Sequence, residues 1–374
     1  MNHSCASTAS IFERSAHLRG VFLALLLATT VVGAEPADEG PLRGPLGRDY
    51  WLAYPPGCDP ATPLWLVVAV HGHNGTGAAH KDFRLSSPRK DYVVVAPTFP
   101  DSEKDGFYQV LEGKADVQLM DLVKSLRTRF KLRPKIFLYG FSGGSQFSHR
   151  FTMAHPELVI GCSSHSGGSW GPAINPAAAG IPCFFSCGLD DSKPSTPQSQ
   201  PRIVEAEGYF TKLLKAGQTS RLRFWEGVGH KPSPGVAAGT AACFELATTG
   251  LFPAQREVVD AELARIDGLI AEGKAPEAKT ALAALPKLRL PEPGPKKPTW
   301  ASLSAEQRTA QRADFVKEGI GGRSGLGRDL WVDDRQENEA GWNVSAAGRT
   351  ALAVQRKAWL DEQVATRKAA LGKR

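Results

Sequence analysis

The chain has 374 residues, of which 42% are hydrophobic and 22% are charged, and its formal net charge is +7. This composition can bury a large core and excludes an intrinsically disordered protein. Acidic and basic residues are interspersed, and no basic block is long enough to form a nucleic-acid-binding arm, so we expect no nucleic-acid partner.

Residues 1–34 have the pattern of a secretory signal peptide. Arg14 and Arg19 precede an apolar run at 20–33, and Val32 and Ala34 suit a small-residue cleavage site. The run is short for a bilayer-spanning helix, although an uncleaved anchor is the alternative. We expect cleavage after Ala34 and an exported protein, periplasmic or secreted, without stable membrane insertion.

Short apolar runs alternate with helical patterns over residues 35–253. Several of these runs are apolar on consecutive positions, which favours a parallel sheet covered on both faces. The strands are expected at 50–55, 63–70, 92–97, 135–140, 158–164, 181–187 and 221–228, and the helices at 115–130, 144–155 and 202–217. This alternation predicts a doubly wound, mostly parallel α/β domain.

Residues 254–374 predict an α-helical C-terminal extension. Two short amphipathic helices around a Gly-Lys turn are expected at 254–285, followed by a Pro- and Lys-rich linker at 286–298. The final segment, 346–374, is amphipathic with a basic end. A partner surface and packing on the preceding domain are both open, and we expect the packing.

The segment 140–144, Gly-Phe-Ser-Gly-Gly, matches the pattern G-x-S-x-G. An apolar run leads into it and a helical pattern follows at once, which is the setting required by a serine nucleophile on a sharp strand-to-helix turn. The helix start also directs backbone N–H groups toward an oxyanion. We predict that Ser142 is a nucleophile; the alternative is a small residue in a tight turn.

A glycine-rich turn at residues 71–77 follows the run at 63–70. A backbone N–H from such a turn joins the N–H of the residue after the nucleophile to form an oxyanion hole. We assign these two donors to His73 and Gly143. The alternative, a metal site at His71 and His73, lacks a third ligand in a zinc pattern, so we expect no metal and no organic cofactor.

Of the nine histidines, only His230 lies beyond residue 165, on a glycine-flanked loop after the run at 221–228. It is therefore the expected base in the order serine, acid, histidine. Asp190 and Asp191 are the carboxylates of the intervening segment that directly follow an apolar run, and one of them would orient the imidazole. His165 ends another run and is a candidate for the wall of the pocket.

Together these residues resemble the α/β-hydrolase superfamily over about residues 48–250. The Gly-x-x-Asp…Pro pattern of that superfamily matches Gly188, Asp191 and Pro194, which implies Asp191 as the acid and leaves Asp190 as the alternative. The resemblance implies the α/β-hydrolase fold for the sheet domain.

Within the superfamily, four segments are similar to secreted polyhydroxyalkanoate depolymerases and feruloyl or acetylxylan esterases. They are RDYWLAYPPG, PLWLVVAVHG, KIFLYGFSGGSQFSHRFTMAHPEL and SSHSGGSW. That group commonly has alanine after the nucleophile, where this chain has Gly143. The chain is also similar to dienelactone-hydrolase-like and prolyl-oligopeptidase-like domains.

The resemblance implies hydrolysis of a small-molecule or polymer ester, carbohydrate-linked, aromatic or polyester, through an acyl-enzyme on Ser142. Phe141 and Trp170 are candidates for the pocket wall, with a core role as the alternative for Phe141. Two other functions stay open: a prolyl-oligopeptidase-like serine peptidase and a non-catalytic binding protein. The sequence carries no indication of the oligomeric state.

Five cysteines remain after residue 34, so at least one thiol is free. Cys183 and Cys187 lie four apart on one expected strand, which is too far for a disulfide. Cys162 can pair with either only if their strands are neighbours. We expect most of these side chains, with Cys58 and Cys243, to be small buried hydrophobes.

Overall fold

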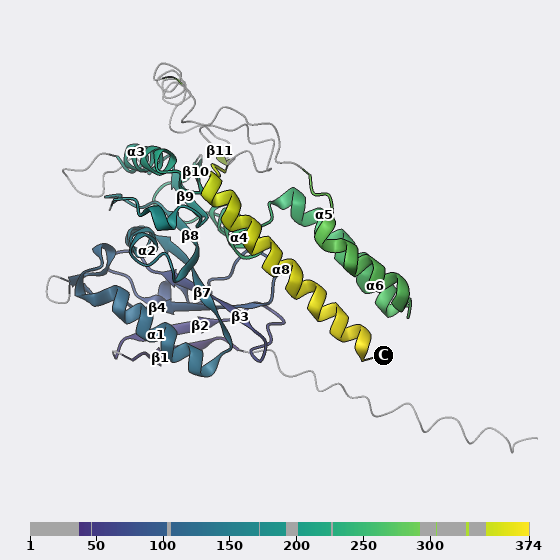
Figure 1. The fold of residues 1–374 in the computed structure, drawn as a ribbon. Helices are drawn as coiled ribbons and strands as arrows, with labels where there is room; N and C mark the ends of the chain where they lie inside the picture. The colour runs from purple at the N-terminus through teal and green to yellow at the C-terminus, as the bar shows by residue number, and fades with distance from the viewer. Residues whose placement is uncertain are drawn as a thin grey trace, which may run out of the picture. The chain divides into compact units, whose positions relative to one another are not determined.

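A computed structural model gives the fold of the chain (Figure 1). It describes residues 37–45, 47–102, 106–171, 173–191, 201–225, 227–291, 304, 327–328 and 342–373. The predicted signal peptide at 1–34 and most of the predicted linker, from 292 to 298, lie outside these residues.

The described strands form one nine-stranded sheet, in the order β1-β2-β4-β3-β7-β8-β9-β10-β11, and a separate hairpin of β5 and β6. The strands of the sheet are β1 (Glu39–Arg43), β2 (Asp49–Ala53), β3 (Leu64–Val70), β4 (Tyr92–Pro97), β7 (Leu132–Phe141), β8 (Val159–His165), β9 (Cys183–Gly188), β10 (Ser220–Trp225) and β11 (Gly327–Arg328). The hairpin pairs β5 (Asp101–Ser102) with β6 (Gly106–Phe107).

The sheet is mostly parallel, as predicted. Strands β4, β3, β7, β8, β9 and β10 run parallel to one another, whereas β2 is antiparallel to both β1 and β4. Every residue of β3 is buried, and its side chains alternate between two cores, Leu66 and Val68 in one and Val67 and Ala69 in the other. Apolar residues on consecutive positions therefore marked strands covered on both faces.

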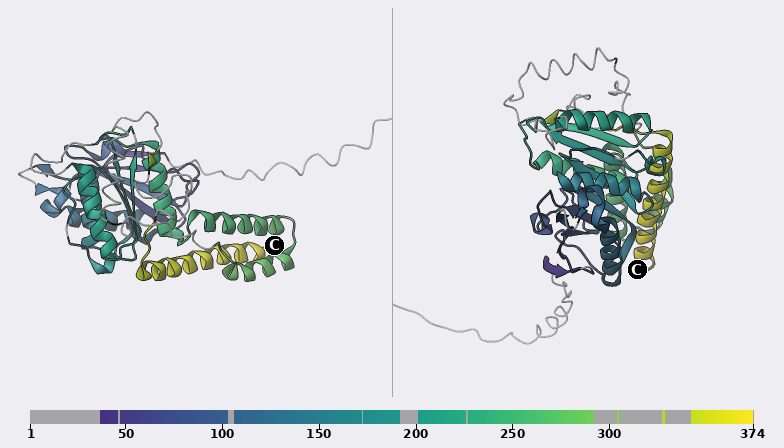
Figure 2. Two further views of the ribbon diagram at one scale, coloured as in Figure 1. Left: turned by 90° about the horizontal axis from the view of Figure 1, so that it is seen from above. Right: turned by 90° about the vertical axis from the view of Figure 1, so that its left-hand side faces the viewer.

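Helices cover both faces of the sheet (Figure 2). Helices α1 (Ala115–Arg129), α2 (Gly143–Ala154) and α3 (Arg202–Lys215) contribute to one core, and α4 (Pro234–Thr249) contributes to the other. The first three match the predicted helices, but the periodicity did not indicate α4. This helix is apolar or small around most of its circumference, so it has no polar stripe that would reveal a helical period.

The C-terminal extension contains the two helices expected around a Gly-Lys turn. They are α5 (Pro253–Ala271) and α6 (Ala275–Ala284), and Gly273 in the turn between them has φ +76°. The final helix, α8 (Ala346–Gly372), packs on α4 through Leu352 and on α5 through Trp359. The described residues from 37 onward belong to one compact unit, and the predicted boundary at 253 and 254 falls in the first turn of α5.

The extension is not wholly helical, which the pattern did not indicate. Strand β11 pairs antiparallel with β10, and Asn343 forms a bridge with Ser220 at the other end of β10. A two-residue strand containing glycine is too short for any alternation of polar and apolar residues to reveal it. The extension therefore completes the edge of the sheet.

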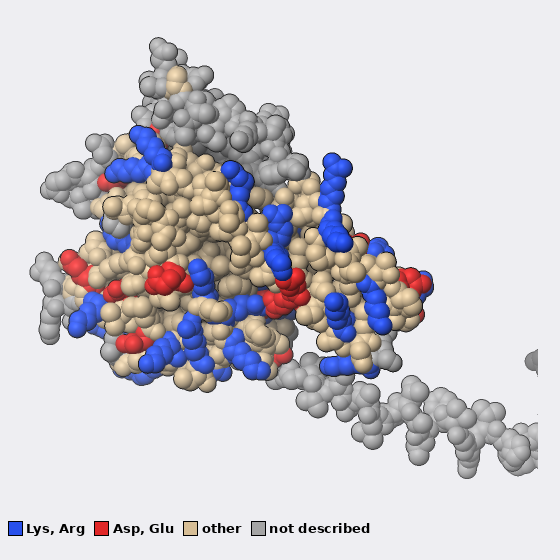
Figure 3. All heavy atoms as spheres, viewed as in Figure 1, with Lys and Arg blue, Asp and Glu red and all other residues tan. Residues whose placement is uncertain are grey.

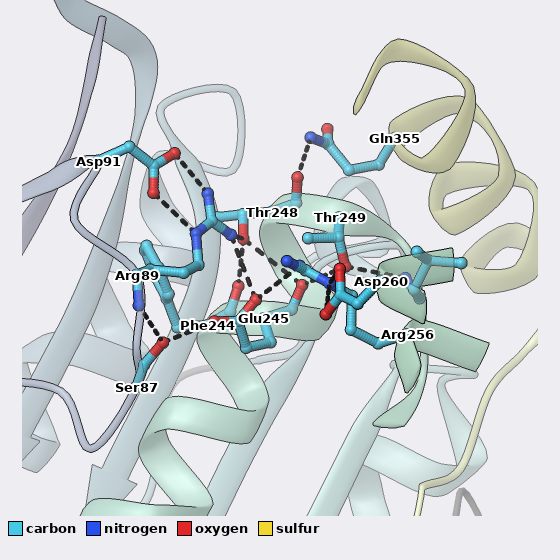
Figure 4. Close-up of polar contacts among 11 residues, drawn as sticks. Ser87, Arg89, Asp91, Phe244, Glu245, Thr248, Thr249, Arg256, Asp260 and Gln355 are labelled. Atoms are coloured by element: carbon cyan, nitrogen blue, oxygen red, sulfur yellow. Dashed lines mark hydrogen bonds and ion pairs between the residues drawn. The ribbon is translucent and has the colours of Figure 1, made fainter. Parts of the chain in front are cut away.

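A network of charged side chains joins the loop before β4 to α4 and α5 (Figure 4). The guanidinium of Arg89 makes two hydrogen bonds to Asp91, of 2.6 and 2.8 Å, and an ion pair with Glu245 at 3.4 Å. Arg256 of α5 contacts the same Glu245 at 3.1 Å and also pairs with Asp260. Burial alone lowers the pKa of Arg89, but Asp91 and Glu245 hold it above its ordinary value, so Arg89 stays charged.

All five cysteines of the described residues are buried free thiols. Cys162 and Cys183 occupy paired positions on the neighbouring strands β8 and β9. Among the described residues, no one helix has the length and apolar composition needed to cross a membrane, and α4 and α5 meet the criteria only as a pair bent by 63°. Figure 3 shows acidic and basic side chains interspersed over the face that it draws.

Candidate active site

Ser142 lies in a strained turn between β7 and α2. Its backbone has φ 55° and ψ −116°, a conformation that residues other than glycine rarely adopt. Its N–H donates to the His165 carbonyl at the end of β8 (2.9 Å), and its own carbonyl accepts from the Gln146 N–H (3.2 Å). These bonds hold Ser142 at the carboxyl edge of the sheet.

The two glycines that flank this turn are required by close backbone packing. A Cβ atom on Gly140 would lie 2.1 Å from the Gly144 carbonyl oxygen, and one on Gly144 would lie 2.1 Å from the Val70 carbonyl oxygen. Real Cβ atoms do not approach backbone so closely. Glycine at both positions lets the turn fit against the end of β3.

The structure brings together the three side chains that the sequence indicated. His230 Nε2 lies 2.9 Å from Ser142 Oγ, and His230 Nδ1 lies 2.8 Å from Asp191 Oδ2. The three residues follow β7, β9 and β10, whose carboxyl ends lie at one edge because these strands are parallel. With Nδ1–H donating to Asp191, Nε2 is left to accept the hydroxyl proton of Ser142.

Asp191 is the buried acid of this arrangement, with only 2% of its surface exposed. Burial by itself raises the pKa of its carboxyl, but His230, and then the charge of Arg202, bring that pKa below its ordinary value. Arg202 Nη1 lies 3.2 Å from Asp191 Oδ1, opposite the oxygen that faces His230. Asp190, the alternative acid, has an exposed side chain, and its backbone N–H donates to the Val228 carbonyl.

Two backbone N–H groups meet beside Ser142. Gly143 begins α2, and a Cβ atom on it would lie 2.9 Å from the His73 nitrogen. A Cβ on Gly72 would lie 3.5 Å from Ser142 Cβ, so the turn after β3 packs against the serine. Within the described part of the chain, neither the Gly143 N–H nor the His73 N–H has an acceptor. Both are therefore available to an oxyanion formed at Ser142.

Close packing gives a physical reason for glycine at position 143. A Cβ atom on Gly143 would lie 2.8 Å from the Tyr108 hydroxyl and 2.9 Å from Gln109 Cγ. These two residues begin the short 3₁₀ helix Tyr108–Val110, which closes over the start of α2. An alanine would force that segment away from the turn.

The sheet order, the antiparallel β2 and the serine turn that joins the central strand β7 to a helix decide the fold. The chain has the α/β-hydrolase fold. The acid and the histidine follow later strands in the order that this fold requires.

No protein-family model and no curated protein matches this sequence. Among solved structures, a thermostable esterase is similar at 19% identity and a TM-score of 0.40, over 49% of this chain and 52% of that one, so the chain spans about half of its length. A poly(3-hydroxybutyrate) depolymerase from Bordetella parapertussis is 21% identical, with a TM-score of 0.44, over 56% and 86% of the two chains. A ferulic acid esterase from Anaeromyces mucronatus is 14% identical, with a TM-score of 0.43, over 52% and 82%.

His165 does not line the pocket of this α/β-hydrolase fold, contrary to expectation. Its ring is fully buried at the end of β8, where it contacts Ser186 Oγ (2.9 Å) and the Lys231 carbonyl (3.0 Å). Burial lowers the pKa of His165 to about 4, so the ring is neutral, with Nε2–H donating to Lys231. Because Lys231 follows His230 directly, His165 supports the loop that carries the base.

Phe141 and Trp170, the other two pocket candidates, have different positions. Phe141 is partly exposed, and the centre of its ring lies 4.9 Å from that of His230. Trp170 stacks on Tyr209 at 5.7 Å and meets Phe185 edge-on at 5.4 Å, packed against the core. These contacts hold its indole beside core aromatic rings, and its assignment to the pocket stays a prediction.

His71 has a structural role in the turn after β3. Its ring is fully buried, its Nε2 accepts the Phe99 N–H (3.0 Å), and its Nδ1–H donates to the Gly72 carbonyl (2.8 Å). Burial lowers the pKa of His71, which keeps this neutral tautomer. Among the described residues, no group of three or more potential metal ligands occurs.

Three further residues of the site escaped the sequence analysis. Arg202 contacts the acid, whereas Asp101 and Gln109 contact the ring of His73. No motif marks them, because each comes from a segment distant in the sequence from the residue that it contacts. The sequence pattern of this fold indicates the candidate serine, acid and histidine, but it does not indicate the residues that hold them in place.

Proposed function

We propose that this protein is an exported serine hydrolase that cleaves carboxylic esters through an acyl-enzyme. The observation that carries the proposal is the strained Ser142, whose hydroxyl lies 2.9 Å from His230 Nε2 while the same ring contacts the buried Asp191. Export rests on the N-terminal pattern of residues 1–34.

The reaction follows from the positions of these groups. Ser142 Oγ attacks the ester carbonyl carbon as its proton passes to His230 Nε2, and Asp191 stabilises the imidazolium. The N–H groups of Gly143 and His73 donate to the tetrahedral oxyanion. His230 then protonates the leaving alkoxide, and a water molecule that the freed imidazole deprotonates attacks the acyl-enzyme.

The substrate class that we propose is an ester of a carbohydrate-linked, aromatic or polyester acyl group, carried by a small molecule or a polymer. The support is the resemblance of the segments around Ser142 and His165 to depolymerases and feruloyl or acetylxylan esterases. The His230 side chain is 36% exposed and the Phe141 ring beside it is partly exposed, so the acyl group meets an aromatic surface next to the base.

The test is hydrolysis of p-nitrophenyl acetate and butyrate by the purified protein, with labelling by a fluorophosphonate probe. We expect Ser142→Ala to lower kcat about 10⁴-fold or more and to abolish labelling. Ser125→Ala, at an exposed serine of α1, is the matched control and should behave as the wild type. An unlabelled wild type, or a Ser142→Ala variant of undiminished rate, would sink the proposal.

A substrate panel then separates the ester classes. It comprises acetylated xylan, feruloyl esters, short polyesters and peptide nitroanilides. Turnover of one of the first three, abolished by Ser142→Ala, supports the proposed class. Cleavage of the nitroanilides without any ester turnover would assign the same residues to a peptidase.

A further inference from the structure

The turn that presents the His73 N–H has little to hold it from within. Asn74 has φ 57°, in the left-handed region that favours glycine, and the Gly75 N–H to Gly72 carbonyl bond (3.0 Å) closes the turn on itself. The His73 N–H has no acceptor in the described part of the chain. Its direction therefore depends on what tethers the residues on either side.

The carboxylate of Asp101 supplies that tether. Its Oδ1 lies 2.9 Å from His73 Nδ1, and its Oδ2 accepts the Asn74 N–H at 2.5 Å. Two consecutive residues of the turn are thus bound to one carboxylate, one through its ring and one through its backbone. The Asp101 side chain is only 7% exposed, whereas the His73 side chain is 50% exposed, so the buried partner holds the exposed one.

The same carboxylate is connected to the other oxyanion donor. Gln109 Nε2 donates to Asp101 Oδ1 at 2.9 Å and lies 2.7 Å from His73 Nδ1. Gln109 Cγ lies 2.9 Å from the position that a Cβ on Gly143 would take. Arg150 of α2 bonds the Gln109 carbonyl at 3.2 Å, so the segment around Gln109 is fixed to the helix that begins at Gly143.

We propose that Asp101 is a positioning residue that fixes the His73 N–H for the oxyanion, through the His73 ring and the Asn74 N–H. The proposal rests on the proposed ester hydrolysis and assigns to it a residue that does not touch the reacting atoms. A donor that must meet an oxyanion at about 3 Å acts only if its backbone is held in advance. An unpaired carboxylate would be costly to bury here, and hydrogen bonds from the His73 ring, the Asn74 N–H and the Gln109 amide offset that cost.

The experiment compares Asp101→Ala, Asp101→Asn and the matched control Asp59→Ala. Asp59 also caps a turn, accepting the Ala61 N–H at 3.0 Å, but it precedes β3 and the turn that carries His73 follows the opposite end of that strand. Loss of an oxyanion donor costs about 10²–10³ in kcat, so a misdirected one should cost about 10- to 100-fold. We expect this loss for Asp101→Ala, with KM for p-nitrophenyl acetate changed by no more than about threefold.

A transition-state mimic separates positioning from a merely structural role. A trifluoromethyl ketone forms an oxyanion on the serine, so its inhibition constant should rise for Asp101→Ala by the same factor as kcat falls. Asp101→Asn retains an acceptor for the Asn74 N–H and should recover most of the loss. Asp59→Ala should match the wild type in both measurements.

Each negative outcome has its own meaning. If the wild type is active and Ser142→Ala is inactive, but Asp101→Ala keeps wild-type kcat and inhibitor binding, Asp101 has no positioning role. If Asp101→Ala raises KM and lowers the melting temperature but binds the ketone as tightly as the wild type does, its role is structural and the proposal is overturned. An inactive, unlabelled wild type would overturn the proposed function and this inference with it.

Discussion

The network around Asp191 and the network around Arg89, both in the described residues, use the same kinds of charged side chain in different ways. At one edge of the sheet, Arg202 and Asp191 hold His230 against Ser142. Near α4 and α5, the network centred on Arg89 joins carboxylates to guanidinium groups and threonine hydroxyls. Both place arginine beside carboxylate at partly buried positions.

The difference lies in what each network leaves open. The network of Arg89 pairs carboxylates with guanidinium groups on both sides of Glu245, and its hydroxyls, those of Ser87 and Thr248, contact no histidine in the described residues. The network of Asp191 ends on the hydroxyl of Ser142, in a strained turn and beside two N–H groups without an acceptor in the described residues. Buried charge alone therefore does not mark a candidate active site; a serine in a strained turn, with an imidazole and available donors beside it, does.

The largest expected effect is that of removing His230, the proposed base of the Asp191 network. We expect His230→Ala to lower kcat for p-nitrophenyl acetate about 10⁴-fold, because no group is left to take the proton of Ser142. The melting temperature should stay near that of the wild type, since the His230 side chain is 36% exposed.

A second histidine–aspartate pair provides the control for this variant. His155 Nε2 lies 3.0 Å from Asp116 Oδ2, a separation close to that between His230 and Asp191. His155→Ala should keep kcat within about twofold, because this pair has no serine to activate. A loss in His155→Ala comparable to that in His230→Ala would show that the assay reports folding instead of proton transfer.

Breaking the other network should cost stability and leave the chemistry intact. We expect Arg89→Met to lower the free energy of unfolding by about 3 kcal/mol, because Asp91 and Glu245 lose a partner whose side chain is 8% exposed. Urea unfolding measures this change, and kcat should remain within about twofold of the wild type. Arg265→Met, which removes the exposed pair with Glu262, should leave the urea midpoint unchanged.

Much of the fold and the reacting groups could be predicted from the sequence, because they depend on local pattern. Consecutive apolar residues identified the parallel strands, and the glycines around Ser142 identified the turn whose packing requires them. The order of serine and histidine singled out His230. The resemblance favoured Asp191 over its neighbour Asp190, and burial distinguishes the two in the structure.

The rest depends on contacts between distant segments. Asp101 contacts Asn74, which lies 27 positions earlier in the chain. Arg202, at the start of α3, contacts Asp191 after β9, and no sequence pattern links these two segments. Helix α4 was missed because an apolar circumference has no helical period. The direction of the Trp170 ring cannot be predicted either, because a tryptophan after a glycine turn has the same pattern whether its ring packs inward or outward.

The smallest expected effect is that of replacing Arg202 in the network of Asp191. Without this charge the pKa of Asp191 should rise, because burial, which raises it, is then less opposed. Asp191 must be ionised to orient His230 and to stabilise the imidazolium, so a raised pKa of Asp191 removes this support at a higher pH as the solution is acidified. We expect Arg202→Gln to move the acid limb of the pH–rate profile upward, with lower rates on that limb.

Arg202→Lys keeps the charge and should leave the limb near its wild-type position. A structural defect alone would lower the rate of Arg202→Gln by one factor at every pH and leave the limb where it was. Movement of the limb to lower pH would contradict the assignment, because it would mean that Arg202 favours the protonated acid. The two networks thus differ in what a lost arginine changes: the pH range over which Asp191 stays ionised in one, and the stability of the fold in the other.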